Sequence, residues 1–401
     1  MVPIQQQKVV IIGHSTTLRL GMVRAIGELG CKIDVIVLGC SERFGLPKPF
    51  DCYSKYISQV FFCSASNGNQ LVDILLNECR ASDQKVILFP TSDFSANVID
   101  NHESVLSEYF LFPHISQSIY SVQDWMDKSK QKELARKVGL NVPNSHVIII
   151  KDRIYSLPAG IDFPCFTKPT VSIEGGKGWF RRCNSQDELC RMLNSFGEKN
   201  DASILVEDYK EIEQEYAVIG FSDGNKVIIP GIVHLEDQTL SHYGVAMTGT
   251  VYPVGEFENI IAQFKSFVLQ MGFVGVFDID FYFCNGRYYF GEMNLRPGAS
   301  GYAITKLGVN LPAMLVRNFR GEDISEMKEL VGDTATFVNE RMCSDDWYIG
   351  FISSKDYREK RASAKISFVK DKDDRMPYKM FELEHSLLRA KKIIKRIIKQ
   401  S

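Results

Sequence analysis

The stretch that decides the fold reads Gly275-Val-Phe-Asp-Ile-Asp-Phe-Tyr-Phe-Cys284, Asn285-Gly286 and Arg287-Tyr-Tyr-Phe-Gly-Glu-Met-Asn-Leu-Arg-Pro-Gly298. Apolar residues on both sides of an Asn-Gly pair predict two antiparallel strands joined by a short turn. Asp278 and Asp280 interrupt the first strand and point to one face, because side chains two residues apart share a face. Burying unpaired carboxylates is costly, so we expect these acids to share a cation.

The register of this hairpin decides which acids meet. A two-residue turn would place Asp280 opposite Gly291 and turn Glu292 to the other face. A three-residue loop over residues 284–286 would instead place Asp278 opposite Glu292. Three-residue loops with glycine in the left-handed conformation are common. We therefore predict the three-residue loop.

In that register Asp280, Glu292 and Asn294 share one face and form a candidate metal site. Oxygen ligands without histidine or cysteine suit Mg²⁺, or Mn²⁺, rather than zinc. The alternative is that these acids lie on the solvated face of an ordinary hairpin. The run Glu-x-Asn-x-Arg-Pro-Gly is far more specific than surface alternation, and it favours the metal site.

A second signal is Phe163-Pro-Cys-Phe-Thr-Lys168-Pro-Thr-Val-Ser-Ile-Glu-Gly-Gly-Lys-Gly178. A lysine at the end of an apolar strand is costly unless an anion meets it, which makes Lys168 a candidate phosphate ligand. The glycines after it allow backbone N–H groups to approach a phosphate closely. The stretch is no P-loop, and no G-x-G-x-x-G follows the first strand. By itself, such a glycine stretch is more often a plain turn.

A third signal consists of two adjoining segments, 204–209 and 211–218. Apolar residues followed by Glu207 are suited to the wall around an adenine ring, and Glu215 is suited to binding ribose hydroxyls. In isolation each segment is better explained as the solvated edge of a sheet.

The composition excludes several classes of protein. The chain has 401 residues, enough for two or three domains, and its 45% hydrophobic and 24% charged content is ordinary for a globular protein. A net charge of -2 gives no indication of a nucleic-acid partner. Ten cysteines without a CxxC pair argue against a disulfide framework or zinc ribbon and favour a reducing cytoplasm. We expect no signal peptide and no membrane-spanning helix.

The order of elements predicts an α/β unit followed by α+β layers. Residues 8–40 read strand, helix, strand, which indicates a parallel sheet continuing to about residue 120. A helix is expected over 124–138. Strands follow over 145–150, 164–168, 204–207, 216–221, 227–230 and 274–283.

The polar end of the chain, 321–401, closes with an amphipathic helix over 385–401 that carries six basic residues. We expect its apolar stripe to pack on the protein or on a second subunit in a homodimer. The alternative is a weak contact with an anionic membrane at the inner face of the cell envelope.

Taken together and in this order, the signals resemble the ATP-grasp superfamily over residues 8–320. The resemblance implies a parallel-sheet pre-ATP-grasp domain over 1–120 and two α+β lobes, 121–210 and 211–320, with the nucleotide between them. Residues 321–401 would form a C-terminal extension. Mg²⁺ and ATP are the implied cofactors.

The resemblance also implies roles for individual residues. Lys128, in the helix start Asp127-Lys128, and Lys168 would contact phosphates, and residues 172–178 would cover the triphosphate. The implied phosphate ligands are Lys128, Lys168, Ser172, Gly175, Gly176 and Gly178, and the implied nucleoside contacts are Glu207 and Glu215. The implied metal ligands are Asp280, Glu292 and Asn294, and the implied catalytic residues are Arg296 and Lys168. Glu292 would bridge two metal ions, and Arg296 would face the transferred phosphoryl group.

Residues 13–24, together with Tyr53-Ser-Lys-Tyr56, look like the branch that includes D-aspartate ligase and related carboxylate–amine ligases. This branch implies that ATP activates a carboxylate as an acyl phosphate, which an amine, such as that of an amino acid, then attacks. ADP and phosphate would be released. Alternatives are a small-molecule kinase, a carboxylate–thiol ligase, and a binding protein with a decayed ATP site.

Candidate substrate-facing residues lie at strand ends and loops, where such sites fall. They are His14, Ser15, Asp93, Arg296 and Ser300. His234 and His242 are further candidates, although a pair of this kind more often lies on the surface or in the core.

Overall fold

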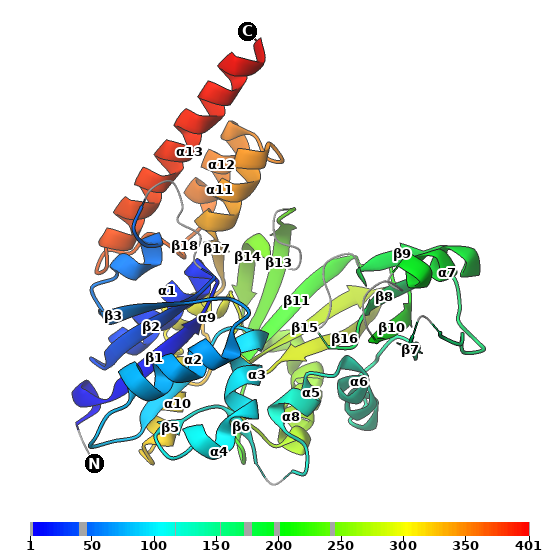
Figure 1. Cartoon of the computed structure of the whole chain (residues 1–401), viewed down its shortest axis with the longest axis horizontal. Coiled ribbons are helices and arrows are strands. Elements are labelled where there is room, and N and C mark those ends of the chain that lie inside the picture. The colour runs from blue at the N-terminus through cyan, green and yellow to red at the C-terminus, as the bar shows by residue number, and fades with distance from the viewer. Residues whose placement is uncertain are drawn as a thin grey trace.

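The computed structural model describes residues 3–39, 46–116, 118–152, 154–171, 179–195, 201–240 and 245–400, with the backbone alone for residues 256 and 395–400. Short helical turns lie at Ile4–Gln6, Phe50–Tyr53, Leu75–Cys79 and Gly255–Phe257. Figure 1 shows the N-terminal sheet, the central sheet and a smaller lobe side by side, with the C-terminal helices projecting from one end.

Five parallel strands form the N-terminal sheet in the order β3-β2-β1-β4-β5. The strands are β1 (Lys8–Gly13), β2 (Lys32–Leu38), β3 (Ile57–Cys63), β4 (Val86–Pro90) and β5 (Phe110–Leu111). The helices of this part are α1 (Thr16–Gly27), α2 (Gly68–Ile74), α3 (Asp93–Asn101) and α4 (Glu103–Leu106). Residues 9–12 of β1 are fully buried, as expected for a parallel sheet covered on both faces. The predicted parallel sheet is confirmed.

The carboxyl ends of β1 and β4 lie against each other. The backbone N–H of Thr91 donates a hydrogen bond of 2.8 Å to the carbonyl of Ile12, and the Thr91 hydroxyl donates one of 2.9 Å. A Cβ atom at Gly13 would lie 1.9 Å from Oγ1 of Thr91, so this approach requires glycine. The predicted substrate residues that follow β1 and β4 therefore share one edge of the sheet.

Most remaining strands belong to a central sheet with the main order β16-β15-β11-β13-β14-β17-β18. Neighbouring strands in this order are antiparallel except β17 and β18, which are parallel. At the margins of the sheet, β6 pairs with β15 and β12 pairs with β11. The strands are β6 (His114–Ile115), β11 (Gln214–Asp223), β12 (Val227–Ile228), β13 (Ile232–Gln238), β14 (Ala246–Tyr252), β15 (Phe273–Cys284), β16 (Arg287–Asn294), β17 (Ala335–Val338) and β18 (Ile366–Ser367).

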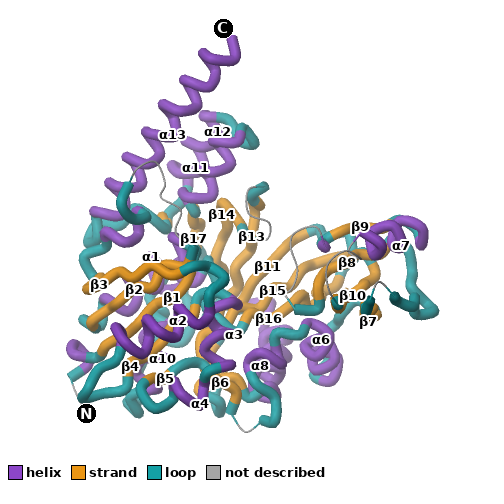
Figure 2. The backbone as a smooth tube through the Cα atoms, in the orientation of Figure 1, coloured by secondary structure: helices purple, strands orange, loops and turns teal. Residues whose placement is uncertain are grey.

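The central sheet is buried by different helices on its two faces. One face packs on α8 (Glu258–Met271) through phenylalanines that include Phe264 and Phe277. The other packs on α1, α9 (Gly301–Lys306) and α10 (Leu311–Phe319), where Ile219 of β11 and Met314 of α10 share a cluster with Val9 of β1. The N-terminal sheet and the central sheet, which lie next to each other in Figure 2, therefore share one core.

A smaller antiparallel sheet, in the order β7-β10-β8-β9, forms the lobe at the right of Figure 1. Its elements are β7 (Ser145–Ile150), β8 (Cys165–Pro169), β9 (Arg181–Cys183), β10 (Ala202–Asp208) and α7 (Gln186–Ser195). The lobe has its own apolar cluster, which includes Ile148, Leu189 and Ile204. The predicted strands of this region are present.

The helix predicted over 124–138 is two helices, so this prediction is wrong at its start. The chain forms α5 (Val122–Trp125) and then α6 (Lys128–Lys137). The carboxylate of Asp127 accepts hydrogen bonds from the backbone N–H groups of Ser129 (2.7 Å) and Lys130 (3.3 Å). An aspartate in this capping position begins a new helix, because it satisfies N–H groups that lack an intrahelical partner. Lys128 is thus the first residue of α6.

The predicted register of the β15–β16 hairpin is also wrong. Cys284 pairs with Arg287 across a two-residue turn in which Asn285 and Gly286 both have positive φ, of 48° and 73°. Both central residues of a type I′ turn adopt this conformation, and its twist matches that of the strands. A register shift between Asp280 and Phe281 then admits one extra residue in β16.

That extra residue is Gly291, and its insertion brings Asp280, Glu292 and Asn294 back to one face of the hairpin. Asp280 pairs with Glu292, and Asp278 pairs with Asn294. A Cβ atom at Gly291 would lie 2.8 Å from the carbonyl oxygen of Asp280, so glycine suits the bulge. The acids meet because a bulge follows a tight turn, and not because the loop is longer.

Residues beyond 320 are part of the same body. β17 pairs with β14, and Arg24 of α1 donates hydrogen bonds to the carbonyls of Phe368 and Val369 and to Asp374. Three helices complete the chain: α11 (Glu340–Ile349), α12 (Ser354–Ser363) and α13 (Met376–Gln400). The C-terminal extension is therefore held to the N-terminal domain by buried contacts.

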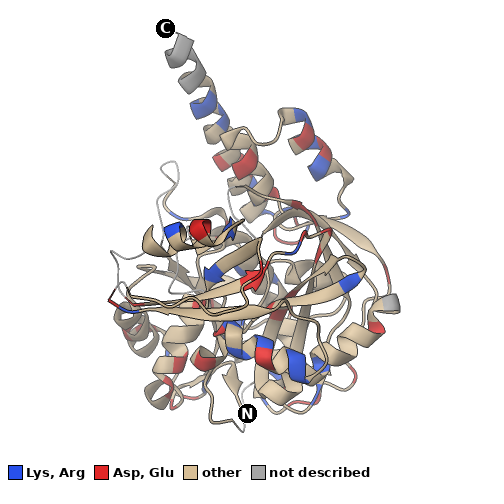
Figure 3. Ribbon diagram, turned by 90° about the vertical axis from the view of Figure 1, so that its right-hand side faces the viewer, with Lys and Arg blue, Asp and Glu red and all other residues tan. Residues whose placement is uncertain are grey.

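The first half of α13 packs on the protein, and the second half projects away from it (Figure 1). His385 stacks on Tyr357 with ring centroids 4.6 Å apart, and Leu388 is buried. Ile393 and Ile394 are about half exposed. Figure 3 shows charges of both signs on α12 and basic turns toward the far end of α13. Among the described residues, no helix is both long and apolar enough to cross a membrane.

Candidate functional site

Three lysines, two of them buried and the third largely buried, converge where the smaller lobe meets the central sheet. Nζ of Lys168 on β8 lies 2.8 Å from Oε2 of Glu207 on β10, and Nζ of Lys132 on α6 lies 2.5 Å from Oε1. Nζ of Lys128 lies 2.9 Å from Oε2 of Glu292 on β16. Each predicted phosphate-binding lysine is therefore held by a carboxylate. The expectation that Lys168 lacks a partner without a bound anion is corrected.

The pKa values in this cluster reflect burial and neighbouring charge. Burial opposes the charged form of Lys168, but Glu207 and Glu292 outweigh it and raise its pKa. Burial likewise opposes an ionised Glu207, and Lys168 and Lys132 outweigh it and lower the pKa of Glu207. Burial would raise the pKa of Glu292, but Lys128 and Lys168 lower it to about 2. At neutral pH the cluster contains ionised carboxylates paired with ammonium groups.

Lys132 is a residue that the sequence reasoning missed. It lies one turn after Lys128 on α6, in a run of four lysines within residues 128–137, where it looks like a surface residue. Its side chain is 1% exposed. Burial and the adjacent Lys168 lower its pKa to about 8, although Glu207 opposes this shift. The spacing from Lys128 was the signal available, because residues four apart share one face of a helix.

The carboxylates of the hairpin gather beside these lysines. Nδ2 of Asn294 lies 3.3 Å from Oδ2 of Asp280, and Nη2 of Arg296 lies 3.2 Å from Oδ1 of Asn294. Nε of Arg296 donates a 2.8 Å hydrogen bond to Asp93 at the start of α3. Burial raises the pKa of Asp278 to about 7, with Arg296 opposing it. Two predicted substrate residues, Asp93 and Arg296, are thus joined to the predicted metal ligands.

The residues present fit a hard divalent cation. Oδ1 of Asp278 is buried without a hydrogen-bond partner among the described residues, and burial and Asp278 raise the pKa of Asp280 well above its usual value. A cation would remove both the repulsion and the unsatisfied oxygen. Within the described part of the chain, no three His, Cys, Asp or Glu side chains form a metal-binding group by themselves. Mg²⁺ takes few protein carboxylates and completes its shell with phosphates and water.

The remaining predicted nucleoside and substrate residues have the following surroundings. Glu215 on β11 accepts a hydrogen bond from Gln238, and burial raises its pKa. His234 stacks on Tyr216 with ring centroids 4.9 Å apart. Ser172, Gly175, Gly176, Gly178 and His242 lie outside the described residues.

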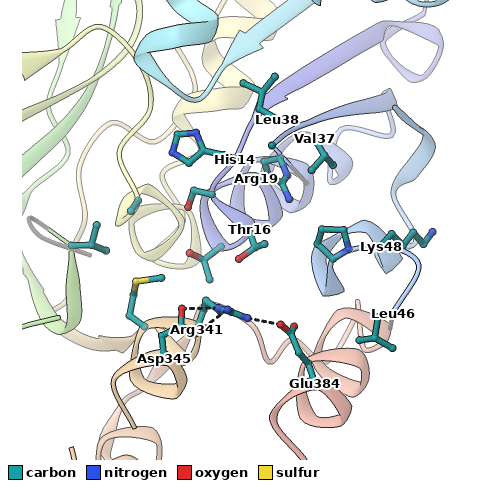
Figure 4. Close-up of a pocket in the computed structure, with 17 residues that line it drawn as sticks. His14, Thr16, Arg19, Val37, Leu38, Leu46, Lys48, Arg341, Asp345 and Glu384 are labelled. Atoms are coloured by element: carbon teal, nitrogen blue, oxygen red, sulfur yellow. Dashed lines mark hydrogen bonds and ion pairs between the residues drawn. The ribbon is translucent and has the colours of Figure 1, made fainter. Parts of the chain in front are cut away.

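Two cavities contain predicted substrate residues. A small one is lined by Asp278, Asp280 and Ser300. A larger one, of about 240 Å³, is lined by His14 and Ser15 and by residues of the C-terminal extension (Figure 4). Both cavities include Val245 and Ala299 in their walls, so they are neighbours. His14, Ser15 and Ser300 therefore line two neighbouring cavities, the smaller of which also contains Asp278 and Asp280.

The fold and this cluster define a class of nucleotide-binding enzyme domain. Residues 133–310 match the ATP-grasp domain family. The chain contains an ATP-grasp domain, and the prediction of the ATP-grasp fold is confirmed.

The relatives agree with this class. The large chain of carbamoyl phosphate synthase from Clostridium beijerinckii is 26% identical over 214 residues, which are 50% of this chain and 19% of that protein. The chain thus corresponds to about a fifth of the curated relatives it matches.

Solved structures share the fold at low identity. The biotin carboxylase domain of 2-oxoglutarate carboxylase from Hydrogenobacter thermophilus superposes with a TM-score of 0.62 and 18% identity, over 82% of this chain and 74% of that one. The L-amino acid ligase of Bacillus licheniformis gives a TM-score of 0.56 and 14% identity, over 82% and 79% of the two chains. The narrower resemblance to D-aspartate ligase stays a prediction.

Proposed function

We propose that the protein is an ATP-dependent carboxylate–amine ligase that works through an acyl phosphate. One observation carries this proposal: largely buried cations suited to phosphates adjoin partly buried acids suited to Mg²⁺, at the junction of two lobes. Lys128 and Glu292 form the link between the two groups, 2.9 Å apart. Such an arrangement neutralises charge during phosphoryl transfer.

The chemistry would proceed in two steps. A carboxylate oxygen of the first substrate attacks the γ-phosphorus of ATP, the bond from that phosphorus to the ADP oxygen breaks, and an acyl phosphate forms. The amine nitrogen of the second substrate then attacks the acyl carbon, inorganic phosphate leaves with its electron pair, and a proton leaves the nitrogen. No side-chain nucleophile is required.

The residues divide these tasks. Lys128, Lys132 and Lys168 would hold the phosphates, with residues 172–178 and the nucleoside contacts Glu207 and Glu215 as predicted. Asp280, Glu292 and Asn294 would hold Mg²⁺ or Mn²⁺, which supplies charge neutralisation and polarises the phosphoryl oxygens. Arg296, positioned by Asp93 at 2.8 Å, would face the transferred group.

The relatives support ligation over the alternatives. The Hydrogenobacter structure contains MgADP and bicarbonate, and the Bacillus protein is named an L-amino acid ligase. A kinase would stop after the first step and release a stable phosphorylated product. A carboxylate–thiol ligase would use the same acyl phosphate but yield a thioester.

An ADP-release assay with pairs of small acids and amines tests the proposal. ADP should appear only with a carboxylate present, and hydroxylamine should replace the amine and yield a hydroxamate. Mass spectrometry should find an amide in the complete reaction. A stable phosphorylated small molecule as the final product would instead establish the kinase, and a thioester the thiol ligase.

We infer two further properties, a homodimer and a contact with membranes. The Hydrogenobacter domain is a dimer, which supports a homodimer here. The exposed Ile393 and Ile394 on a helix with basic turns are suited to weak contact with an anionic membrane, in an enzyme of the cytoplasm.

A further inference from the structure

One cavity lies between the start of α1 and the helices of the C-terminal extension (Figure 4). Its volume is about 240 Å³. This is below the roughly 300–1,000 Å³ of sites for drug-sized ligands, so the cavity suits a small metabolite and not a nucleotide. Residues of α11 and α13 form one wall, which the ATP-grasp match over 133–310 does not include.

Three charged side chains stand together on that wall. Nη1 of Arg341 lies 2.7 Å from Glu384 of α13, and Nη2 lies 2.9 Å from Oδ1 of Asp345. The Arg341 side chain is 4% exposed, and Nη2 makes no hydrogen bond of good geometry within the described residues despite its ion-pair distance. Nε donates a further 2.9 Å hydrogen bond to Oδ2 of Asp345, so two carboxylates hold the guanidinium and Nη2 is the nitrogen left without a hydrogen bond. A ligand oxygen that accepts from Nη2 would satisfy this buried donor.

The opposite wall is the first turn of α1. Ser15 precedes the helix and makes no side-chain capping bond. Asn339, which caps α11, donates a 3.4 Å hydrogen bond to the hydroxyl of Thr17 and fixes the two walls together. The N–H groups of a helix start favour an anion, which adds to the attraction of Arg341. Charges of both signs therefore line a small space.

The rest of the lining is apolar. Val37 and Leu38 at the end of β2, Leu46, and Met342 of α11 line the cavity. A ligand that fills it therefore carries a carboxylate, an ammonium group and a compact apolar part. A free α-amino acid with an apolar side chain has these three features.

We propose that this cavity binds a free apolar α-amino acid as the amine substrate, with Arg341 recognising its carboxylate and Asp345 its ammonium group. The proposal rests on the ligase function proposed above. Because Arg341 holds the carboxylate, the amine is the group left to react. The cavity shares Val245 and Ala299 with the smaller cavity that contains Asp278 and Asp280, so a bound amino acid lies next to the proposed site of the acyl phosphate. The C-terminal extension thus selects the second substrate.

Calorimetric titration of the full-length protein, saturated with MgADP, tests the inference. Alanine, leucine, methionine, phenylalanine, aspartate and lysine would each be compared with their carboxamide and N-acetyl forms. At least one free apolar amino acid should bind, and blocking either end should weaken its binding by about tenfold or more, because a buried ionic partner is then left unpaired. No binding by any free amino acid, or equal binding of the carboxamides, would overturn the inference.

Variants locate the binding. Arg341→Lys and Asp345→Asn should each weaken the binding of the amino acid by about tenfold or more and leave the affinity for MgADP within about twofold of wild type. Arg358→Lys, on exposed α12, is the matched control and should change neither affinity. Thr16→Met fills the cavity without removing a charge, and should abolish amino-acid binding even if Arg341→Lys fails to fold. Unchanged amino-acid affinity in Thr16→Met and Asp345→Asn would show that Arg341 only joins α11 to α13.

The nucleotide titration separates this inference from the ligase proposal. If MgADP binds but no amino acid does, the inference fails and the ligase proposal stands. If an amino acid binds to the cavity and ADP release never requires a carboxylate, the ligase proposal fails instead.

Discussion

Replacing Glu292 by glutamine tests the centre of the proposed site, because this carboxylate is shared between the lysines and the metal ligands. The glutamine keeps the size of the side chain and removes its charge. Loss of a bridging carboxylate should lower turnover by about a hundredfold or more. A hundredfold loss corresponds to about 2.7 kcal/mol of transition-state stabilisation.

The effect on stability should be smaller. The pKa of Glu292 is lowered from 4.5 to about 2, which would correspond to about 3 kcal/mol of stability at neutral pH. The side chain is 29% exposed, and screening reduces this contribution. Its charge also raises the pKa values of Asp278 and Asp280, and the substitution removes that repulsion. We expect a net loss of about 1–2 kcal/mol.

The sign of the pH dependence follows from the lowered pKa. The stabilisation is present above the unfolded pKa of about 4.5 and is lost as the pH falls toward about 2. The difference between wild type and Glu292→Gln in urea unfolding should therefore shrink over that range. Glu322→Gln is the matched control, because Glu322 pairs with Arg317 and Arg320 at similar exposure and lies away from the site. It should lose stability and keep its activity.

The assay is ADP release across a Mg²⁺ titration, paired with urea unfolding. Glu292→Gln should require more Mg²⁺ for half-maximal activity and stay below wild type at saturation. Near-wild-type activity at ordinary Mg²⁺ would refute the metal assignment. An equal loss in Glu322→Gln would show that reduced stability, and not metal binding, explains the result.

Three further predictions concern separate parts of the structure. Lys168→Met should weaken the binding of ATP by about tenfold. Its loss of stability should be modest, because Lys132 still pairs with Glu207. If ATP raises the melting temperature equally in variant and wild type, Lys168 does not bind the phosphates. The free energy of unfolding of the wild type, relative to that of Lys132→Met, should rise by up to about 1.4 kcal/mol per pH unit between about pH 8 and 10.5, because the unfolded chain binds the Lys132 proton more tightly there. If urea unfolding gives both proteins the same dependence of stability on pH, the pKa of Lys132 is not lowered. The full-length protein should sediment with anionic vesicles at low salt and be released at high salt, whereas an Ile393→Glu/Ile394→Glu variant should stay in the supernatant; if both stay there, the membrane contact fails.

The sequence predicts local elements of this protein well and three-dimensional details less well. The parallel sheet and the strands of both lobes follow from alternation and β-branched runs, which are local properties. The hairpin register does not, because a bulge at Gly291 offsets the two-residue turn, and only the close approach to Asp280 distinguishes that glycine. The break before α6 was indicated by Asp127, a capping residue inside a helical pattern.

The residues of the candidate site are also predicted from the sequence only where a local pattern marks them. Lys168 and Glu292 are conspicuous in sequence because each interrupts an apolar strand. Lys132 sits among other lysines, and its burial depends on the packing of α6 against β10 and β8. Arg341 and Glu384 lie in a polar region without a recognisable motif, more than forty residues after the last shared motif. Their proximity to His14 and Ser15 arises only when the C-terminal extension folds back on α1.

The pairing of lysines with carboxylates explains how the site can exist before its ligands arrive. Buried lysines without partners would lose their protons or destabilise the fold. Glu207 holds Lys132 and Lys168, and Glu292 holds Lys128, so the cations stay charged and in position. A triphosphate alone would add about four negative charges beside these carboxylates, whereas two Mg²⁺ ions bring about the same positive charge. The two ligands together therefore leave the charge of the site nearly unchanged, and each favours the entry of the other.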